Sequence, residues 1–393
     1  MIEALLKPEV QKFIRDHAND DPVALILKAK QFKNIPIQQA IEQIQSRKKA
    51  KSKLPSWYAS SQLIFPPPLS IEQSSSEQAA KYKAALFKGE NFVDLTGGMG
   101  IDFSFISQSF NNGSYVERQL NLVELAKHNF KCLNIHNVEI LNENGESFIK
   151  NTEKRFDLIY LDPARRGDHQ QKVFRVEDCE PNVLALMPIL REKGKSILIK
   201  MSPLLDIKGA ILDLEGVTEV HIVAINNEVK ELLFIIDKDS SNDPLIKCID
   251  LNDDLVNFQF RYGQEEETIS PLGEVENYLY EPNVALLKAG AFKRLATHFG
   301  LNKLHVNSHL YTTKQAIFNF PGRSFKVLRE IKLNKKALRK AIPEMKVNIT
   351  VRNYPVSVEE IRKKTGLKEG GQIYLFATTD IVGKKLLLCE KVI

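Results

Sequence analysis

Residues Val93–Phe103 read VDLTGGMGIDF, and this stretch decides the class of fold. Apolar residues lead into an acid, Asp94, and then into a run with three glycines. This pattern is typical of a buried parallel strand that turns abruptly into a helix around a nucleotide-like ligand. Gly97, Gly98 and Gly100 have no Cβ, so the backbone can take positive φ angles and lie directly against a ligand. The amides at the start of the following helix then face that ligand.

A second acid ends the next apolar run. Tyr115-Val116-Glu117 follows the glycines by about twenty residues, which places Glu117 where a ribose diol needs an acceptor with two oxygens. A cofactor that contains a nucleoside is therefore predicted. The segment DLTGGMG lacks the G-x-G-x-x-G spacing of Rossmann dehydrogenases and resembles motif I of the class I S-adenosylmethionine (SAM) methyltransferases. That resemblance implies that Asp94 lies near the methionine end of SAM and that Thr96 and the three glycines contact the cofactor.

Strands and helices alternate along the middle of the chain. Strands are expected at 91–95, 113–117, 137–141, 156–161, 195–200, 219–225 and 231–236, with helical patterns between most of them. Such alternation specifies a mostly parallel sheet covered by helices on both faces. The predicted fold class is therefore α/β, with a Rossmann-like, seven-stranded methyltransferase sheet that an antiparallel pair of strands closes.

The segments on either side of this sheet have other patterns. Residues 1–73 predict a helical region, with helices over 3–17, from Pro22 onward and after Pro36. Residues 237–270 are acidic and irregular, and we expect a connector there with a short hairpin near 245–260. A helix is expected from Pro282 to Phe299, followed by strands at 303–311 and 315–320. The last segment predicts strands at 323–331, 346–352, 372–379 and 385–392 and helices at 334–341 and 357–364. These patterns place domains at 1–73, 74–238, 239–320 and 321–393.

Composition and charge narrow the classes of function. The 393 residues are 43% hydrophobic and 26% charged, as in an ordinary globular protein. No apolar run approaches the roughly 18 residues that span a bilayer, and the first residues lack the pattern of a signal peptide, so we expect a cytoplasmic protein. The 4 cysteines form no C-x-x-C pair, which predicts neither a disulfide framework nor a metal site. Residues 321–393 hold 17 Lys and Arg against 7 Asp and Glu, and this excess of positive charge predicts either a solvated basic face or a surface for nucleic acid.

The stretch FDLIYLDPARRG, residues 156–167, is the next most informative. An apolar strand ends at Asp162, at the carboxyl edge of the sheet where open α/β folds bind ligands. Methyl transfer needs an aligned and desolvated acceptor and a group that takes up a proton, and Asp162 suits the last two roles. Ala164 and Arg165 depart from the [D/N]-P-P-[Y/F] signature of amino methyltransferases. Asp-Pro-x-Arg resembles the uridine C5 methyltransferases, but no thiol nucleophile follows Lys200, after the next strand.

These patterns predict a non-covalent mechanism with Asp162, Lys200 and Arg165 as catalytic candidates, and with Arg165 or Arg166 as a contact for a substrate phosphate or carboxylate. A ribose 2′-O-methyltransferase is an alternative, because such enzymes carry a Lys-Asp-Lys-Glu tetrad. The chain offers Lys83 or Lys81, then Asp162, Lys200, and Glu231 or Glu228 in that order. Paired surface charges would explain the same residues. Glu146, after the third strand, is expected to accept a hydrogen bond from the adenine amino group, or to lie in an exposed turn.

Several segments together resemble the bacterial class I SAM-dependent methyltransferases with a THUMP-like C-terminal domain, a family of the Bacteroidetes. They are SSSEQAAKYKAAL, VDLTGGMGIDF, YVERQ, LDPARRG, VEDCEPNV, IKMSPLLDI, NNEVKELL, YEPNVALLKAGAF, FPGRSF and KVNITVRNYP. The resemblance implies a helical N-terminal region, a methyltransferase domain, a small ferredoxin-like domain and a THUMP-like end. Val229 stands where the family has cysteine, which argues against a role for a thiol there.

THUMP domains bind RNA, and the basic C-terminal segment fits such a role. We therefore predict a SAM-dependent methyltransferase that acts on RNA, with tRNA or rRNA as the target class. The candidate phosphate contacts are Arg323, Arg352, Arg362, Lys363 and Lys364. Two other classes stay open, namely a methyltransferase of proteins or small molecules, and a non-catalytic RNA-binding protein that retains the SAM fold.

Overall fold

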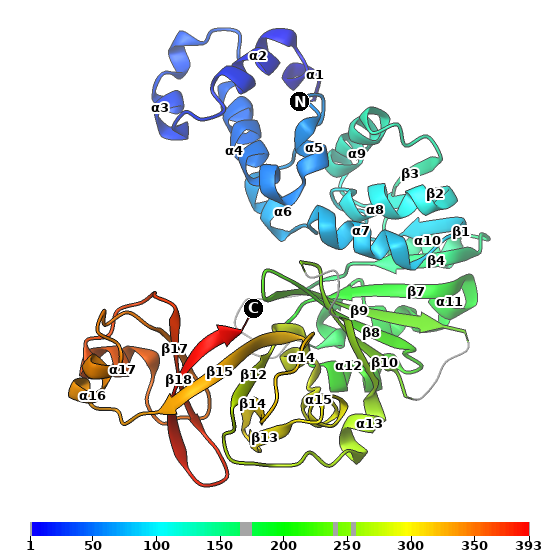
Figure 1. The fold of residues 1–393 in the computed structure, drawn as a ribbon. Helices are drawn as coiled ribbons and strands as arrows, with labels where there is room; N and C mark the ends of the chain where they lie inside the picture. The colour runs from blue at the N-terminus through cyan, green and yellow to red at the C-terminus, as the bar shows by residue number, and fades with distance from the viewer. Residues whose placement is uncertain (1, 166–174, 239–242, 253–256, 393) are drawn as a thin grey trace. The chain divides into compact units, whose positions relative to one another are not determined.

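The computed structural model describes residues 2–165, 175–238, 243–252 and 257–392, and in it the chain divides into two units. Unit 1 comprises Met1–Val217 and Phe234–Ser240. Unit 2 comprises Thr218–Leu233 and Ser241–Ile393. Figure 1 shows the elements of both units, coloured from blue at the N-terminus to red at the C-terminus.

Helices form the first part of unit 1, as predicted. They are α1 (Ile2–Leu5), α2 (Pro8–Asp16), α3 (Pro22–Leu27), η1 (Ala29–Gln31), α4 (Ile37–Lys53), α5 (Pro55–Ala59) and α6 (Pro68–Gln73). The single helix expected over 3–17 is instead two helices, because Pro8 has no N–H with which to continue α1 and it begins α2. Asp21 caps α3, since its carboxylate accepts a hydrogen bond of 3.1 Å from the amide of Ala24.

The remainder of unit 1 is a sheet with the strand order β9-β7-β4-β1-β2-β3. The strands are β1 (Gly89–Asp94), β2 (Phe110–Glu117), β3 (Val138–Asn142), β4 (Phe156–Leu161), β7 (Gly194–Met201) and the part of β9 (Glu228–Asp237) that begins at Phe234. The helices are α7 (Glu77–Leu86), α8 (Ile101–Ile106), α9 (Leu120–Cys132), α10 (Gly145–Asn151), α11 (Val183–Lys193) and α12 (Ile207–Leu214), with the short 3-10 helices η2 (Ser107–Ser109) and η3 (Val176–Asp178). β1 pairs in parallel with both β2 and β4, so the carboxyl ends of these strands meet at one edge.

A two-stranded ribbon that the sequence did not predict follows β4. β5 (Ala164–Arg165) pairs in antiparallel fashion with β6 (Cys179–Glu180). Residues 166–174, which connect the two strands, lie outside the described part of the chain. The ribbon brings Glu180 and Pro181 to the carboxyl edge of the sheet.

Unit 2 begins with the hairpin of β8 (Glu219–Ile225) and the first half of β9. Asn226 and Asn227 connect the two strands with φ angles of 53° and 56°, the left-handed conformation that a two-residue hairpin turn requires. β10 (Leu245–Asp250) pairs in parallel with β8 and in antiparallel fashion with β11 (Asn257–Arg261). The hairpin expected near 245–260 is therefore confirmed. The expected connector is wrong, because β10 is an integral strand with buried Ile246 and Cys248.

The last part of unit 2 is a sheet with the order β13-β14-β12-β15-β18-β17-β16. Its strands are β12 (Tyr278–Pro282), β13 (Asn302–His305), β14 (Ser308–Thr313), β15 (Gly322–Glu330), β16 (Asn348–Val351), β17 (Ile373–Thr379) and β18 (Lys384–Val392). The helices of this part are α13 (Tyr262–Glu267), α14 (Val284–Ala289), α15 (Phe292–Phe299), α16 (Lys335–Ala341) and α17 (Val358–Thr365).

Three predictions for this region are wrong. The helix expected over 282–299 is two helices, since Gly290 takes the left-handed conformation that ends α14. The strand expected over 303–311 is the hairpin of β13 and β14, and the strand expected at 315–320 is absent from these described residues. The strands and helices expected after residue 322 are all present.

Candidate functional site

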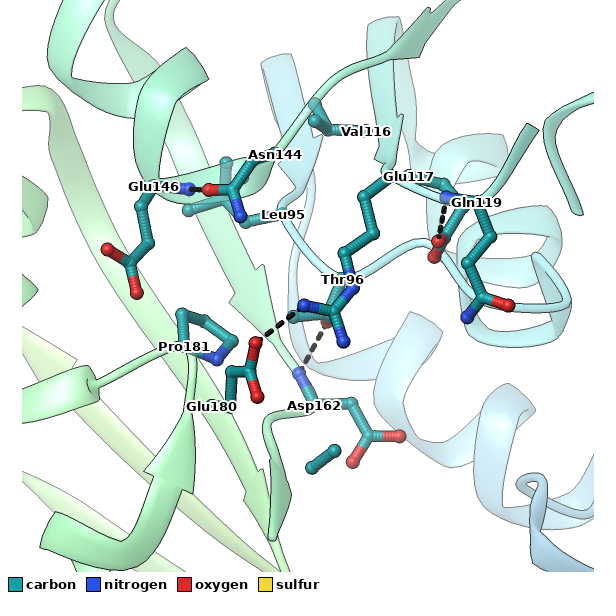
Figure 2. A pocket seen from close by; sticks show the side chains of 13 residues that line it. Leu95, Thr96, Val116, Glu117, Gln119, Asn144, Glu146, Asp162, Glu180 and Pro181 are labelled. Carbon is teal, nitrogen blue, oxygen red and sulfur yellow. Dashed lines mark hydrogen bonds and ion pairs between the residues drawn. The ribbon is translucent and has the colours of Figure 1, made fainter. Parts of the chain in front are cut away.

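A cavity of about 160 Å³ lies at the carboxyl edge of the sheet of unit 1. Residues at the ends of β1, β2, β3 and β4 line it, together with Glu180 of the ribbon and Pro181, which follows it. Figure 2 shows side chains of these segments converging on the same space. Four of the predicted site residues, Thr96, Glu117, Glu146 and Asp162, therefore lie around one cavity.

Asp94, at the end of β1, holds the turn that follows it. Its buried carboxylate accepts hydrogen bonds from the amide of Thr96 at 2.9 Å and from the hydroxyl of Thr96 at 3.2 Å. The Thr96 hydroxyl oxygen in turn accepts a bond of 2.7 Å from the amide of Asp162, which ties the turn after β1 to the turn after β4 (Figure 2). Burial, together with the negative charges of Asp102 and Asp162, raises the pKa of Asp94 to about 8.

The three glycines of the turn are required for different structural reasons. A Cβ on Gly97 would lie 2.4 Å from the ring of Tyr115, and one on Gly100 would lie 2.6 Å from the ring of Phe130. These two glycines therefore make room for aromatic side chains of the core. Gly98 has a φ of 57° and no such ring beside it, so only its backbone conformation requires glycine. None of the three glycines lines the cavity itself.

Glu117 links the end of β2 to the glycine turn. One carboxylate oxygen accepts a bond of 2.9 Å from the amide of Gly98, and the other accepts a bond of 2.7 Å from the amide of Gln119. A carboxylate oxygen has two lone pairs, so each oxygen keeps a position for a further donor. Glu117 is thus held in place by backbone amides at the wall of the cavity.

The turn after β3 begins α10 against the first turn. The side chain of Asn144 caps the helix by accepting bonds from the amides of Glu146 at 2.8 Å and Ser147 at 3.3 Å. A Cβ on Gly145 would lie 2.2 Å from the carbonyl oxygen of Leu95, so glycine is required for this close approach. The carboxylate of Glu146 accepts a bond of 3.3 Å from the amide of Asn182, which directs it toward the start of α11.

A network of charged side chains extends from Asp162 into the core of unit 1. Asp162 forms an ion pair with Lys200 of β7. The Lys200 ammonium also donates to the hydroxyl of Ser75 at 3.3 Å and lies 3.9 Å from the carboxylate of Asp102. Asp102 accepts bonds of 2.7 Å from Ser75 and from the phenol of Tyr160.

Lys83 completes this network from α7. Its side chain is 0% exposed, and its ammonium lies 3.1 Å from Asp102 and 3.1 Å from the Ser75 hydroxyl. Burial would raise the pKa of Asp102, but the charges of Lys83 and Lys200 outweigh that effect and hold it below its ordinary value. Two lysines and two aspartates therefore alternate from the core to the cavity.

The alternative lysines and glutamates that the sequence left open differ in burial and in partners. Lys83 belongs to the network, whereas Lys81 is exposed and pairs with Glu77. In unit 2, Glu231 is buried while Glu228 is exposed and pairs with Lys230. Sequence reasoning missed Asp102, Ser75 and Tyr160. Asp102 belongs to the glycine-rich stretch VDLTGGMGIDF and is the second residue of the helix that follows the turn. An acid at that position is the sequence signal that could have identified it.

The predicted contact residues at the C-terminal end lie in unit 2. Arg323 and Arg352 both pair with Glu281, and Arg362 lies 3.6 Å from Glu369. Lys363 and Lys364, also predicted, are exposed in the last turn of α17. The side chain of Arg165 and all of Arg166 lie outside the described part of the chain.

No helix of residues 2–165, 175–238, 243–252 and 257–392 is long and apolar enough to cross a membrane. Within the same ranges, no group of three or more His, Cys, Asp or Glu residues is arranged to hold a metal ion.

The strand order, the glycine turn after β1 and the acid at the end of β2 define a methyltransferase of the Rossmann-like class. A solved structure from Porphyromonas gingivalis W83, provisionally named a methyltransferase, is 35% identical and has a TM-score of 0.89, with 100% of this chain and 98% of that chain covered. The chain belongs to the family of that protein.

Other comparisons identify the C-terminal domains. Residues 278–321 match the model of a ferredoxin-like domain, and residues 322–391 match the model of a THUMP-like domain. An uncharacterized RNA methyltransferase of Mycoplasma mobile is 33% identical over 78 residues, which are 20% of this chain. The chain matches 22% of the length of that protein. The predicted resemblance to methyltransferases with a THUMP-like C-terminal domain is thereby confirmed.

Proposed function

We propose that this protein is a SAM-dependent methyltransferase that modifies RNA, with tRNA or rRNA as the target class and Asp162 at the acceptor site. The observation that carries the proposal is the position of the ion pair of Asp162 and Lys200. It lies at the edge of the cavity that the ends of β1 to β4 form, and it is anchored to the core through Asp102.

The groups around the cavity fit the chemistry of SAM. Glu117 offers carboxylate oxygens to a ribose diol, and the turn of Asn144 and Gly145 offers an amide and backbone groups to adenine. Asp94 and Thr96 lie at the turn that would hold the methionine end, where the positive charge of a bound ammonium group would favour the ionised form of the Asp94 carboxyl. Bound SAM would supply the electrophilic methyl group, and its sulfur would keep the electron pair of the S–C bond that breaks.

The side chains at the acceptor position favour an oxygen acceptor, such as a ribose 2′-hydroxyl. Cys179, the cysteine nearest to this site in sequence, is buried with its sulfur 4.0 Å from the sulfur of Met201, an environment that does not suit a nucleophile. Ala164 stands where an amino methyltransferase has proline. In this mechanism Asp162 accepts the hydroxyl proton as the new O–C bond forms, and the Lys200 ammonium stabilises the negative charge that develops on the oxygen.

Two observations support RNA as the acceptor molecule: the positive charge of the C-terminal segment and the similarity to an RNA methyltransferase. Residues 321–393 hold 17 Lys and Arg against 7 Asp and Glu, and they include the THUMP-like domain. The Mycoplasma relative is named an RNA methyltransferase. We also propose the domain limits 1–73, 74–238, 239–320 and 321–393, and cytoplasmic localisation stays a prediction of the sequence.

The first experiment is calorimetry of SAM binding to protein freed of bound ligand. We expect binding that Glu117→Ala weakens at least tenfold, because the ribose loses its acceptor. Glu124→Ala is the matched control, since Glu124 is an exposed acid on α9 that pairs with Lys127. Absence of SAM binding at millimolar concentration would overturn the proposal.

The second experiment is mass spectrometry of RNA nucleosides from a deletion strain beside its parent. We expect one methylated nucleoside, modified on its ribose, to be missing and to return with the wild-type gene. In an in vitro assay on RNA from the deletion strain, Lys200→Met should methylate at less than about one hundredth of the wild-type rate. Lys195→Met, at an exposed position near the start of β7, should keep the wild-type rate. Unchanged RNA nucleosides, with SAM binding intact, would favour a protein or small-molecule acceptor or a non-catalytic RNA-binding role.

A further inference from the structure

A second cavity, of about 240 Å³, lies within unit 2 beside a cluster of three charged side chains. The cluster consists of Glu281 on β12, Arg323 on β15 and Arg352, which follows β16. Glu281 and Arg323 face each other as partners in the antiparallel pairing of β12 and β15. All three residues line the cavity.

The cluster is a buried anion that orients two cations. Glu281 has a side chain that is only 4% exposed, whereas those of Arg323 and Arg352 are 42% and 44% exposed. Both Nε and Nη2 of Arg323 donate to one oxygen of Glu281, the former at 2.9 Å. Nη2 of Arg352 lies 2.8 Å from the other oxygen. One carboxylate thus fixes two guanidinium groups, and these three side chains together carry one net positive charge.

The close approach of the β12 and β15 backbones allows this arrangement of side chains. A Cβ on Gly322 would lie 2.1 Å from the carbonyl oxygen of Glu281, so only glycine allows β15 to begin this close to β12. The amide of Asn283 donates to the carbonyl of Pro321 at 3.0 Å and joins the two segments just beyond. These residues come from the stretches YEPNV and FPGRSF, to which the methyltransferase site gives no role.

The remaining polar groups define what the cavity can bind. A guanidinium presents five N–H donors in a rigid fork that matches a phosphate, and the Nη1 group of Arg323 takes no part in the pairs with Glu281. Asp250 and Asn227 line the same cavity and add a carboxylate and an amide. The charge of Asp250 disfavours a bare phosphate. Its Oδ1 accepts bonds of 3.1 Å from the backbone amide and the side chain of Asn252, and its Oδ2 can accept a bond from a hydroxyl. A ribonucleotide offers both the anion and the hydroxyl, and a deoxyribonucleotide lacks the 2′-hydroxyl.

We propose that this cavity, with Arg323, Arg352 and Asp250, is a subsite for one ribonucleotide of an RNA chain. The arginines hold its phosphate and Asp250 accepts from its ribose. The proposal rests on the proposed function in that it takes RNA as the ligand. It adds a preformed binding position in unit 2, with its own preference for RNA over DNA.

The test measures binding of a single-stranded RNA of mixed sequence, and of the matching DNA, to the full chain by fluorescence anisotropy over a salt series. We expect Arg323→Gln with Arg352→Gln to weaken RNA binding at least tenfold and to lower the salt slope by about 1, the loss of one phosphate contact. The control is Lys335→Gln with Lys336→Gln, which removes the same charge from exposed positions of α16. It should weaken binding less than threefold. Asp250→Asn should lower the ratio of RNA to DNA affinity toward 1.

Equal affinities of the arginine variant and the lysine control would overturn the subsite while the proposed methyltransferase stands. An unchanged ratio of RNA to DNA affinity in Asp250→Asn would likewise overturn it. A wild-type protein that binds SAM but no RNA at low salt would overturn both the subsite and the RNA acceptor. Where the glutamine variant fails to fold, Arg323→Lys with Arg352→Lys keeps the charge and removes the fork. That variant should bind RNA at least threefold more weakly, and wild-type affinity in it would refute the subsite.

Discussion

Replacing Lys83 by methionine tests whether the buried charges of unit 1 depend on one another. The ammonium of Lys83 lies 3.1 Å from Asp102 in a side chain that is 0% exposed, so Lys83→Met leaves the Asp102 carboxylate in the core without its nearest cation. Breaking a buried ion pair costs about 3–5 kcal/mol. Lys200, at 3.9 Å, and the hydroxyls of Ser75 and Tyr160 still favour the ionised carboxylate, so we expect a loss of about 3 kcal/mol.

The assay is urea unfolding followed by the fluorescence of Trp57, the 1 tryptophan of the chain. Trp57 is buried and packs in one cluster with Ala80 of α7 and Ile101 of α8, so it reports on the region that holds the network. Lys83→Met with Asp102→Asn should be more stable than Lys83→Met alone by at least about 1 kcal/mol, because the buried charge is gone. The reasoning is refuted if Lys83→Met costs less than about 1 kcal/mol or if the two substitutions are additive.

Three further substitutions test the turn and the chemistry. The pKa of Asp94 is raised from 3.8 to about 8, so the stability that protonated Asp94 contributes is complete below pH 3.8 and lost as the pH rises to 8. The urea concentration at the unfolding midpoint should therefore fall less between pH 5 and 8 in Asp94→Asn than in wild type. An unchanged pH profile would contradict a buried neutral carboxyl at Asp94. Gly97→Ala should cost about 1–3 kcal/mol, because its Cβ would lie 2.4 Å from the ring of Tyr115. An unfolding midpoint equal to that of wild type would show that the ring has room to move. Cys179→Ser should keep the methylation rate within about threefold, since the proposed chemistry forms no thioether; a rate one hundredfold lower in the folded variant would indicate a covalent route.

Much of the fold could be predicted because its signals are local. The alternation of apolar runs with helical patterns predicted each strand from β1 to β9 that pairs in the sheets, apart from the ribbon of β5 and β6. That ribbon spans two residues on each side, too short for any periodicity to show. The errors near 282–311 have a similar origin. The hydrophobic pattern of the sequence continues through Gly290, which separates α14 from α15. It also continues through Val306 and Asn307, which form the turn between β13 and β14.

Three cavity residues, Thr96, Glu117 and Asp162, were predictable for the same reason, since each lies at the end of a strand or just after it. Parallel strands bring their carboxyl ends to one edge, so the positions of Thr96, Glu117 and Asp162 in the sequence already imply that they converge. The reason for two of the glycines was not predictable. Gly97 and Gly100 accommodate Tyr115 and Phe130, which are distant in sequence and belong to other elements of the core.

Asp102 shows what sequence reasoning lacks at such a site. The lysines and Asp162 were recognised as one set by their order along the chain, but the residue that joins them lies in a helix where an acid is ordinarily solvated or favours the helix N-terminus. Its role follows only from its neighbours, because Ser75, Lys83 and Tyr160 each contact it from a different segment of the chain. A carboxylate that is buried, accepts from two hydroxyls and lies between two ammonium groups cannot easily change its charge. Asp102 therefore fixes the position of Lys200, and through Lys200 it orients the carboxylate of Asp162 at the cavity.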